Sequence, residues 1–260
     1  MRIVVKIGTS TLAHAGGRLN IRRVELLCKV LSDLKNAGHQ LVLVSSGAIG
    51  MGVGKLGLPG RPADMPGKQA AAAVGQCELM YTYDKMFAEY SHTVAQLLLT
   101  ADDIRDDRRS IHVHDTLERL LEYQALPIIN ENDAVATDEI GIETTIGEND
   151  SLSAIVAQLV QADLLILLSD IDGLYTADPH RNVDAVLIPE VREITDEILA
   201  LAGGAGSSLG SGGMATKLHA AQITTAAGID MIIANGEHPE VLYDIFEGRA
   251  VGTRFIGKKD

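Results

Sequence analysis

Short hydrophobic runs alternate with amphipathic stretches along the whole chain. Runs bounded by glycine or polar residues are typical of buried strands, and they predict strands at 3–7, 41–44, 94–98, 127–129, 164–168, 231–234 and 253–256. Between the first two runs, Val24, Leu27, Leu31 and Leu34 recur at helical spacing, and Gly38 follows as a stop signal. Similar patterns predict helices at 118–122 and 152–159.

This alternation predicts an α/β fold, a three-layer αβα sandwich whose mostly parallel central sheet carries helices on both faces. The continuous apolar run 164–168 is typical of a central parallel strand, because such a strand is buried on both sides. Residues 139–148 predict a short hairpin, and the glycine-rich segment 203–213 predicts a loop that could act as a lid.

The size and composition predict a compact protein. At 260 residues the chain is near the upper size for one hydrophobic core, so we expect one domain or two closely packed lobes. The sequence has no run of about 18 apolar residues that would span a membrane, and its first strand begins at once, without a signal-peptide pattern. Cys28 and Cys77 have no metal or redox spacing. We therefore expect a cytoplasmic protein.

The net charge narrows the classes of partner. A formal net charge of −13 opposes general binding to nucleic acids or to anionic membranes. A phosphate site in such a chain must be a local basic cluster. Lysines in apolar or glycine-rich surroundings, such as Lys6 and Lys217, are therefore the informative ones.

Residues 210–217 read Gly-Ser-Gly-Gly-Met-Ala-Thr-Lys and lead into an apolar helical stretch. Free backbone N–H groups at a helix start, the helix dipole and Lys217 together favour an anion, such as a phosphate group. A flexible surface loop in front of a helix is the alternative for this segment taken alone. The dinucleotide pattern G-x-G-x-x-A also matches, but Asp230 precedes an apolar run, whereas the ribose-binding acid should end its strand. Residues 252–258 resemble a P-loop, but Lys259 replaces the required Ser or Thr.

Polar or glycine-rich residues follow several of the predicted strands. Ligands of open α/β sheets bind beyond the carboxyl ends of the strands, so these residues predict one shared site. Lys6 is notable because a lysine inside an apolar strand is costly unless its ammonium group reaches water or an anion. The segments are 6–10, 45–52, 130–133, 147–151 and 169–175. For each segment alone, a solvent-reaching lysine, a helix N-cap or an Asx turn remains an alternative.

Six motifs taken together closely resemble the amino-acid kinase family: VVKIGTS (4–10), VSSGAIGMG (44–52), INENDAV (129–135), GENDSLSA (147–154), LLSDIDGLYTADP (167–179) and GSGGMATK (210–217). They occur in order over nearly the whole chain, which makes the resemblance specific. Within the family, they are most similar to members that phosphorylate the γ-carboxylate of L-glutamate with ATP, the first step of proline biosynthesis. The resemblance implies one kinase domain over 1–260, with an amino-acid-binding lobe at about 1–165 and an ATP-binding lobe at 166–260.

The resemblance also implies roles for individual residues. Lys6 and Lys217 would stabilise the transferred phosphoryl group, with Asp150 holding both ammonium groups. The implied substrate-binding residues are Ser46, Gly47, Ala48, Asp133 and Asn149. The implied ATP-binding residues are Lys6, Gly8, Ser169, Asp170, Ser211, Gly212, Gly213, Met214, Ala215, Thr216 and Lys217. Mg²⁺ would be bound mainly through the ATP phosphates, so no dedicated metal site is expected.

The same resemblance implies how the enzyme would be inhibited and how it would assemble, and other functions remain as alternatives. Proline as a feedback inhibitor and a homo-oligomeric state are family expectations, and the chain ends before the PUA domain that many such kinases carry. One alternative is a kinase of the same fold acting on aspartate, carbamate or acetylglutamate. Another is a non-catalytic small-molecule sensor, which would have no need of Lys6, Asp150 and Lys217. A Rossmann dehydrogenase is disfavoured by the position of Asp230.

Overall fold

The computed structural model describes residues 1–14, 18–135, 149–179, 181–202 and 213–258. Its strands are β1 Arg2–Ile7, β2 Gln40–Ser45, β3 Val94–Leu99, β4 Leu126–Glu131, β5 Leu164–Ser169, β6 Glu190–Val191, β7 Asp230–Asn235 and β8 Thr253–Phe255. Its helices are α1 Thr9–Leu12, α2 Ile21–Asn36, α3 Ala48–Leu56, α4 Met65–Ala88, α5 Ala101–Arg105, α6 Asp107–Glu122, α7 Asn149–Leu159, α8 Asp196–Ala202, α9 Met214–Ala226 and α10 Val241–Phe246.

The strands of the described residues form one eight-stranded sheet in the order β3-β4-β2-β1-β5-β7-β8-β6. The pairs from β3 to β7 are parallel, whereas β8 runs antiparallel to β7 and β6 pairs with β8. The expected mostly parallel sheet is therefore confirmed, and all seven predicted strands are present within two residues of their predicted ends. The two-residue edge strand β6 was not predicted, because so short a segment shows no hydrophobic period.

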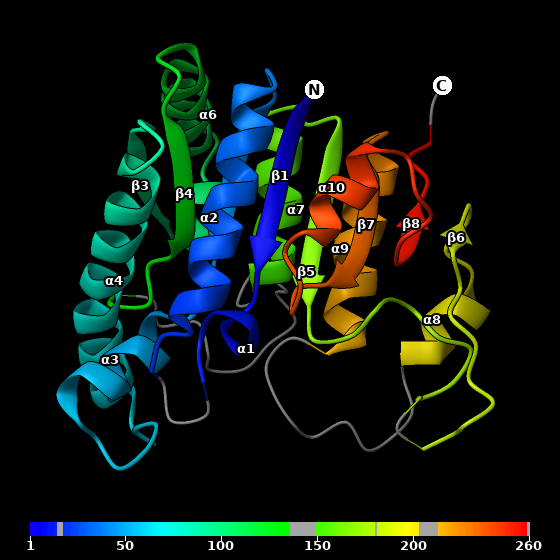
Figure 1. Cartoon of the computed structure of the whole chain (residues 1–260), viewed down its shortest axis with the longest axis horizontal. Coiled ribbons are helices and arrows are strands. Elements are labelled where there is room, and N and C mark those ends of the chain that lie inside the picture. Colours follow the sequence, from blue (N-terminus) through cyan, green and yellow to red (C-terminus); the bar gives the residue numbers. More distant parts are fainter. Residues whose placement is uncertain (15–17, 136–148, 180, 203–212, 259–260) are drawn as a thin grey trace.

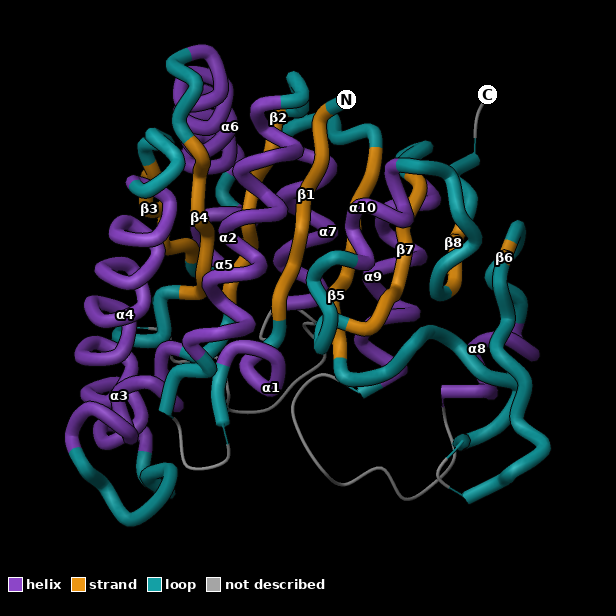
Figure 2. The backbone as a smooth tube through the Cα atoms, viewed as in Figure 1, coloured by secondary structure: helices purple, strands orange, loops and turns teal. Residues whose placement is uncertain are grey.

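Helices cover both faces of the sheet, as expected for a three-layer sandwich. Figure 1 shows α2 and α10 in front of the central strands, and α7 and α9 behind them. The core divides in the same way: one buried cluster contains side chains of α2, α4 and α10, and the other contains side chains of α6, α7 and α9. The tube in Figure 2 shows that the carboxyl ends of β1, β5 and β7 lie at the same edge of the sheet.

Alternation along β1 directs Lys6 to a defined face. Ile3, Val5 and Ile7 belong to the cluster under α2 and α4, and Val4 belongs to the cluster under α7 and α9. Since successive side chains of a strand point to opposite faces, Lys6 lies on the side of Val4. The fold thus brings this lysine to the layer that contains α7 and α9.

The long helix α4 was not predicted as a separate element. Its first half buries the small or polar side chains Ala71, Ala72, Gly75 and Gln76, whereas its second half buries Leu79, Tyr83 and Phe87 at helical spacing. Small residues serve a close crossing with α3: a Cβ added to Gly75 would lie 1.8 Å from the carbonyl oxygen of Ala48. The two helices therefore pack backbone against backbone.

Four further expectations concern the hairpin, the lid loop, Asp230 and a membrane span. The hairpin expected at 139–148 lies outside the described residues, as does the expected lid loop 203–213 except for Gly213. Asp230 is the first residue of β7 and accepts hydrogen bonds from Arg254 and from the backbone N–H of Gly257, so it has a structural role. In the described ranges, no helix combines the length and apolar character needed to cross a membrane.

Candidate active site

Three charged side chains from distant parts of the chain meet at the carboxyl edge of the sheet. The Nζ of Lys6 lies 2.6 Å from Oδ1 of Asp150, and the Nζ of Lys217 lies 3.1 Å from Oδ2 of the same carboxylate. Only 7%, 1% and 4% of Lys6, Asp150 and Lys217 are exposed. One carboxylate thus holds two ammonium groups, one on each oxygen.

Local structure explains this convergence. Lys6 is the last residue but one of β1, on the face covered by α7, and Asp150 is the second residue of α7. Lys217 is the fourth residue of α9, which packs against α7. Thr216, which precedes it, donates a hydrogen bond of 2.9 Å from its hydroxyl group to Oδ2 of Asp150. The sequence motifs indicated Thr216 only as a residue near ATP.

The cluster carries more positive than negative charge in a buried place. Burial by itself raises the pKa of the Asp150 carboxyl, but the ammonium groups of Lys6 and Lys217 and the Thr216 hydrogen bond outweigh it, and the pKa lies below its ordinary value. Asp150 is therefore ionised at neutral pH, and it contacts two ammonium groups. Two ammonium groups held at one place can donate charge-assisted hydrogen bonds to an anionic ligand such as a phosphate group.

The start of α9 adds uncharged donors to the same place. The helix begins at Met214 after Gly213, and no side chain among the described residues caps its N-terminus. Ala215 is exposed and Met214 is half-buried. Backbone N–H groups and the helix dipole at such an N-terminus favour an anion. Ser211 and Gly212 lie outside the described residues.

The ends of β1 and β5 place the remaining predicted ATP-binding residues beside this cluster. Ile7 pairs with Leu168, so Gly8 and Ser169 follow neighbouring positions at the sheet edge. A Cβ added to Gly8 would lie 3.7 Å from the Nζ of Lys6. Ser169 donates a 3.1 Å hydrogen bond to the carboxylate of Asp170, which is exposed.

The turn after β2 leads from the sheet into α3. The backbone N–H of Ser46 donates to the carbonyl of Ile7, which ties this turn to the end of β1. Gly47 has φ of 107°, a left-handed conformation that favours glycine, and Ala48 begins α3. The turn therefore lies next to the segment that follows Lys6.

A cavity of about 370 Å³ lies beside this turn, between α4 and the ends of β3 and β4. Ala48, Gln76, Glu131, Asn132 and Asp133 are among the residues that line it. The structure thus brings two of the predicted substrate-binding residues, Ala48 and Asp133, to one cavity. Its acidic lining suits a ligand that carries a cationic group.

Asn149 is held by two buried amides, Asn130 and Gln76, of which only Asn130 lies in a segment predicted from the sequence. Its side-chain amide donates a 3.2 Å hydrogen bond to Oδ1 of Asn130, and Nδ2 of Asn130 donates a 2.9 Å hydrogen bond to Oε1 of Gln76. Asn130 lies near the end of β4 and belongs to the polar segment 130–133 predicted as part of the site. The only sequence feature that marks Gln76 is its position as an amide within an alanine-rich stretch. In the structure its side chain is buried.

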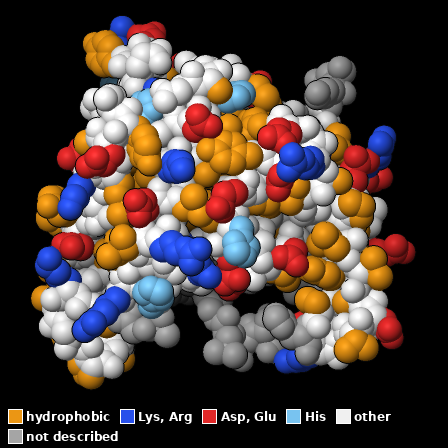
Figure 3. Space-filling model, in the orientation of Figure 1, with side chains coloured by type: hydrophobic (Ala, Val, Ile, Leu, Met, Phe, Trp, Pro, Cys, Tyr) orange, Lys and Arg blue, Asp and Glu red, His pale blue; other side chains and the backbone are white. Residues whose placement is uncertain are grey.

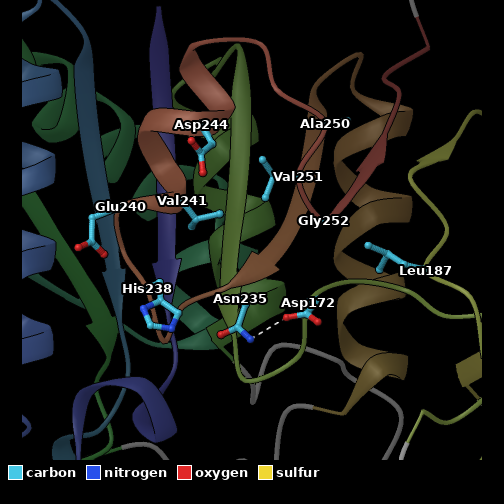
Figure 4. A pocket seen from close by; sticks show the side chains of 10 residues that line it. All are labelled: Asp172, Leu187, Asn235, His238, Glu240, Val241, Asp244, Ala250, Val251 and Gly252. Atoms are coloured by element: carbon cyan, nitrogen blue, oxygen red, sulfur yellow. Dashed lines mark hydrogen bonds between the residues drawn. The ribbon is translucent and has the colours of Figure 1, made fainter. Parts of the chain in front are cut away.

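A larger cavity, of about 630 Å³, lies on the α10 side of the sheet. Figure 4 shows its side chains, among them Asp172, Glu240 and Asp244, and the hydrogen bond from Asn235 to Asp172. Among the residues that the structure describes, three carboxylates and no lysine or arginine line it, so it does not favour a phosphate group. The Lys6–Asp150–Lys217 cluster is the better anion site.

Basic and acidic side chains are mixed on one face of the molecule. On the face shown in Figure 3, lysine and arginine side chains lie among aspartates and glutamates rather than in one broad basic area. Among the residues described, no group of three or more His, Cys, Asp and Glu side chains could hold a metal ion.

The chain is similar to known proteins over most of its length. The profile of the amino acid kinase family matches residues 1–235. The glutamate 5-kinase of Clostridium perfringens (strain 13 / Type A) is 56% identical over 258 residues, which cover 99% of this chain and 96% of that protein. The glutamate 5-kinase of Listeria innocua serovar 6a is 53% identical over 259 residues, which cover 100% and 94%.

Solved structures share the fold at lower identity. The product complex of T. acidophilum isopentenyl phosphate kinase has a TM-score of 0.68 at 22% identity and covers 98% of this chain and 100% of that one. The carbamate kinase from Giardia lamblia bound to AMP-PNP has a TM-score of 0.68 at 19% identity, with 99% and 98% covered. By the family profile and its similar relatives, this chain belongs to the amino acid kinase family.

Proposed function

We propose that this chain transfers the γ-phosphoryl group of ATP to the γ-carboxylate of L-glutamate, giving L-glutamyl 5-phosphate and ADP. One observation carries the proposal: a buried carboxylate holds two ammonium groups at the edge where the strands of a parallel sheet end. The similarity to curated glutamate 5-kinases supports glutamate as the acceptor. The reaction would form the first product of proline biosynthesis.

The proposed reaction needs charge stabilisation rather than a general base. The γ-carboxylate of glutamate has an ordinary pKa of about 4.3, so at neutral pH it is already an ionised nucleophile. Its oxygen forms a bond to the γ-phosphorus, the bond from that phosphorus to the bridging oxygen breaks, and ADP leaves with the electron pair. Lys6 and Lys217 stabilise the negative charge on the phosphoryl oxygens during transfer. Asp150 fixes the direction of both ammonium groups.

The two substrates would bind on opposite sides of this cluster. Glutamate binds in the lobe of residues 1–165, where the carboxylate of Asp133 faces its α-ammonium group. The residues around it are Ser46, Gly47, Ala48, Asp133 and Asn149. In the lobe of residues 166–260, the residues around ATP are Ser169, Asp170, Ser211, Gly212, Gly213, Met214, Ala215, Thr216 and Lys217. Lys6 reaches the phosphates from β1, and the backbone of Gly8 lies beside them just after this strand.

Magnesium would enter with ATP. Both oxygens of Asp150 contact ammonium groups, so this carboxylate is not an open magnesium ligand. The ion would be held mainly by phosphate oxygens and water, and it would neutralise part of the phosphate charge. The chain itself adds the positive charges of Lys6 and Lys217. We further propose a cytoplasmic homo-oligomer that proline inhibits.

The test is a substrate panel with the purified chain. ADP release with Mg-ATP is measured for L-glutamate, aspartate, carbamate and N-acetylglutamate, and the acyl phosphate is trapped with hydroxylamine. We expect glutamate to be preferred, and N-acetylglutamate to react poorly, because an acetylated amine carries no charge for Asp133 to pair with. Comparable rates with N-acetylglutamate, or a preference for another acid, would overturn the assignment.

A further inference from the structure

We propose that Gln76 is a positioning residue: through Asn130 it orients Asn149 so that the side-chain oxygen of Asn149 accepts a hydrogen bond from the α-ammonium group of the amino-acid substrate. This inference rests on the proposed function and deepens it. It assigns a direction to each amide of the hydrogen-bonded path from Gln76 through Asn130 to Asn149, in which only Gln76 lies outside the sequence motifs.

The three side chains connect three elements across the edge of the sheet. Gln76 lies on α4, Asn130 on β4 and Asn149 at the start of α7. Gln76 and Asn130 are 8% and 1% exposed, so their amides depend on each other rather than on water. The hydrogen bonds of 2.9 Å and 3.2 Å form a continuous path from α4 to α7.

One backbone donor sets the direction of the whole path. The N–H of Glu131 donates a 2.9 Å hydrogen bond to Oδ1 of Asn130. A backbone N–H can only donate, so the Asn130 oxygen must face it and its NH₂ group must face Gln76. Gln76 must then present its oxygen, and Asn149 must present its NH₂ group to the Asn130 oxygen. The Oδ1 atom of Asn149 is consequently left over.

That leftover atom points to the chemistry of its ligand. Oδ1 of Asn149 is buried and has no hydrogen-bond partner among the residues that the structure describes. A buried acceptor without a donor costs free energy, and a ligand that brings N–H groups removes this cost. An ammonium group can supply such a donor, whereas a carboxylate cannot. Asn149 therefore accepts a hydrogen bond from the ammonium group of the substrate, and Gln76 holds the Asn149 side chain in that orientation.

The experiment compares Gln76→Met with Gln76→Glu. Methionine has a similar shape but offers no acceptor oxygen to Asn130, whereas glutamate offers one in either protonation state. For Gln76→Met we expect the KM for glutamate to rise on the order of ten-fold, with the KM for ATP and kcat within about two-fold of the parent. Gln76→Glu should recover most of the loss. Gln158→Met, on the exposed face of α7, is the matched control and should resemble the parent.

A competitor without an amine separates positioning from general damage. Glutarate has both carboxylates but no ammonium group, so its inhibition constant should stay unchanged in Gln76→Met while the KM for glutamate rises. Equal losses for glutarate and glutamate, or a Gln76→Glu variant no better than Gln76→Met, would overturn the inference. If Gln76→Met does not fold, Gln76→Leu removes the same oxygen and is read in the same way. An inactive parent protein would instead refute the proposed function.

Discussion

At the scale of single residues, Asp150 organises the candidate site. Its two oxygens receive one ammonium group each, and Thr216 donates a third interaction. None of these three partners is its neighbour in the sequence. Charged groups this deeply buried act as a unit, because removing one leaves the others without compensation.

Replacing Lys217 with alanine tests the proposed catalytic charge. We expect Lys217→Ala to lower kcat on the order of 100-fold or more, as is typical when a donor that stabilises transition-state charge is removed. The measurement is steady-state ADP release with saturating glutamate and Mg-ATP. Lys29→Ala, at an exposed position of α2, is the control for loss of a lysine. Near-normal turnover in a folded Lys217→Ala protein would contradict the role.

Replacing Asp150 with asparagine tests the electrostatic argument through stability. Two buried ammonium groups would then lack their counter-charge, so we expect the free energy of unfolding at pH 7 to fall by about 3 kcal/mol. The folded-state pKa of Asp150 lies below its ordinary value, so its ionised form stabilises the fold above about pH 4. This contribution is lost as the pH falls through the folded-state pKa.

The pH series has a clear outcome. Urea unfolding of the parent and of Asp150→Asn should differ by a constant amount from pH 7 to about pH 5, and the difference should shrink only below about pH 4. Asp115→Asn, on the exposed face of α6, should show no such difference. A gap that widens on acidification would show that Asp150 is not stabilised in its ionised form.

At the scale of elements, the crossing of α3 and α4 positions the cavity assigned to glutamate. A Cβ on Gly52 would lie 1.8 Å from the carbonyl oxygen of Ala71, and a Cβ on Gly75 would lie equally close to that of Ala48. Backbone atoms cannot move aside as flexible side chains do. The distance between the two helices is therefore set by glycine at these two positions.

Gly75→Ala should separate the helices. We expect it to lower the free energy of unfolding by about 2 kcal/mol, the usual scale for overpacking. It should also raise the KM for glutamate more than that for ATP, since Ala48 and Gln76 line the cavity beside this crossing. Urea unfolding and initial rates measure both effects. Gly60→Ala, where an added Cβ meets nothing within 4 Å, is the control. Unchanged stability of Gly75→Ala would refute this account of the crossing.

At the scale of the whole molecule, the two proposed lobes share one sheet and one core. Their boundary, near residue 165, falls within β5, which pairs with β1 from Ile3↔Leu164 to Ile7↔Leu168. The cluster under α7 and α9 contains Val42 and Ile129 together with Met231 and Ile233. A continuous core of this kind couples the halves energetically.

We therefore expect cooperative unfolding of the whole molecule. In a denaturant series followed by hydrogen exchange and mass spectrometry, peptides that cover β2 and β7 should lose protection at the same midpoint. Far-ultraviolet circular dichroism and tyrosine fluorescence should report that midpoint too, and the chain contains six tyrosines and no tryptophan. Separate midpoints for β2 and β7 would show instead that the lobes are independent folding units.

The sequence alone determined the strands, their order along the chain and the polar residues at their carboxyl ends. These features are local, because burial of one face imposes a period on hydrophobic residues, and turns require glycine or small polar residues. The motifs that carry Lys6, Asp150 and Lys217 were also legible, since lysine in apolar or glycine-rich surroundings is unusual. The long helix α4 was missed although Leu79, Tyr83 and Phe87 recur at helical spacing in its second half; only its first half buries mainly alanine and glycine.

Only the tertiary structure decided which polar atoms meet. Lys6 and Lys217 share one carboxylate, and Gln76 is linked to Asn149. Both contacts depend on the strand order, on the close crossing of α3 and α4, and on the packing of α7 against α9. Hydrogen bonds and ion pairs act over about 3 Å, so a shift of one ångström between elements remakes or removes them. A hydrophobic pattern tolerates such a shift and therefore cannot encode it.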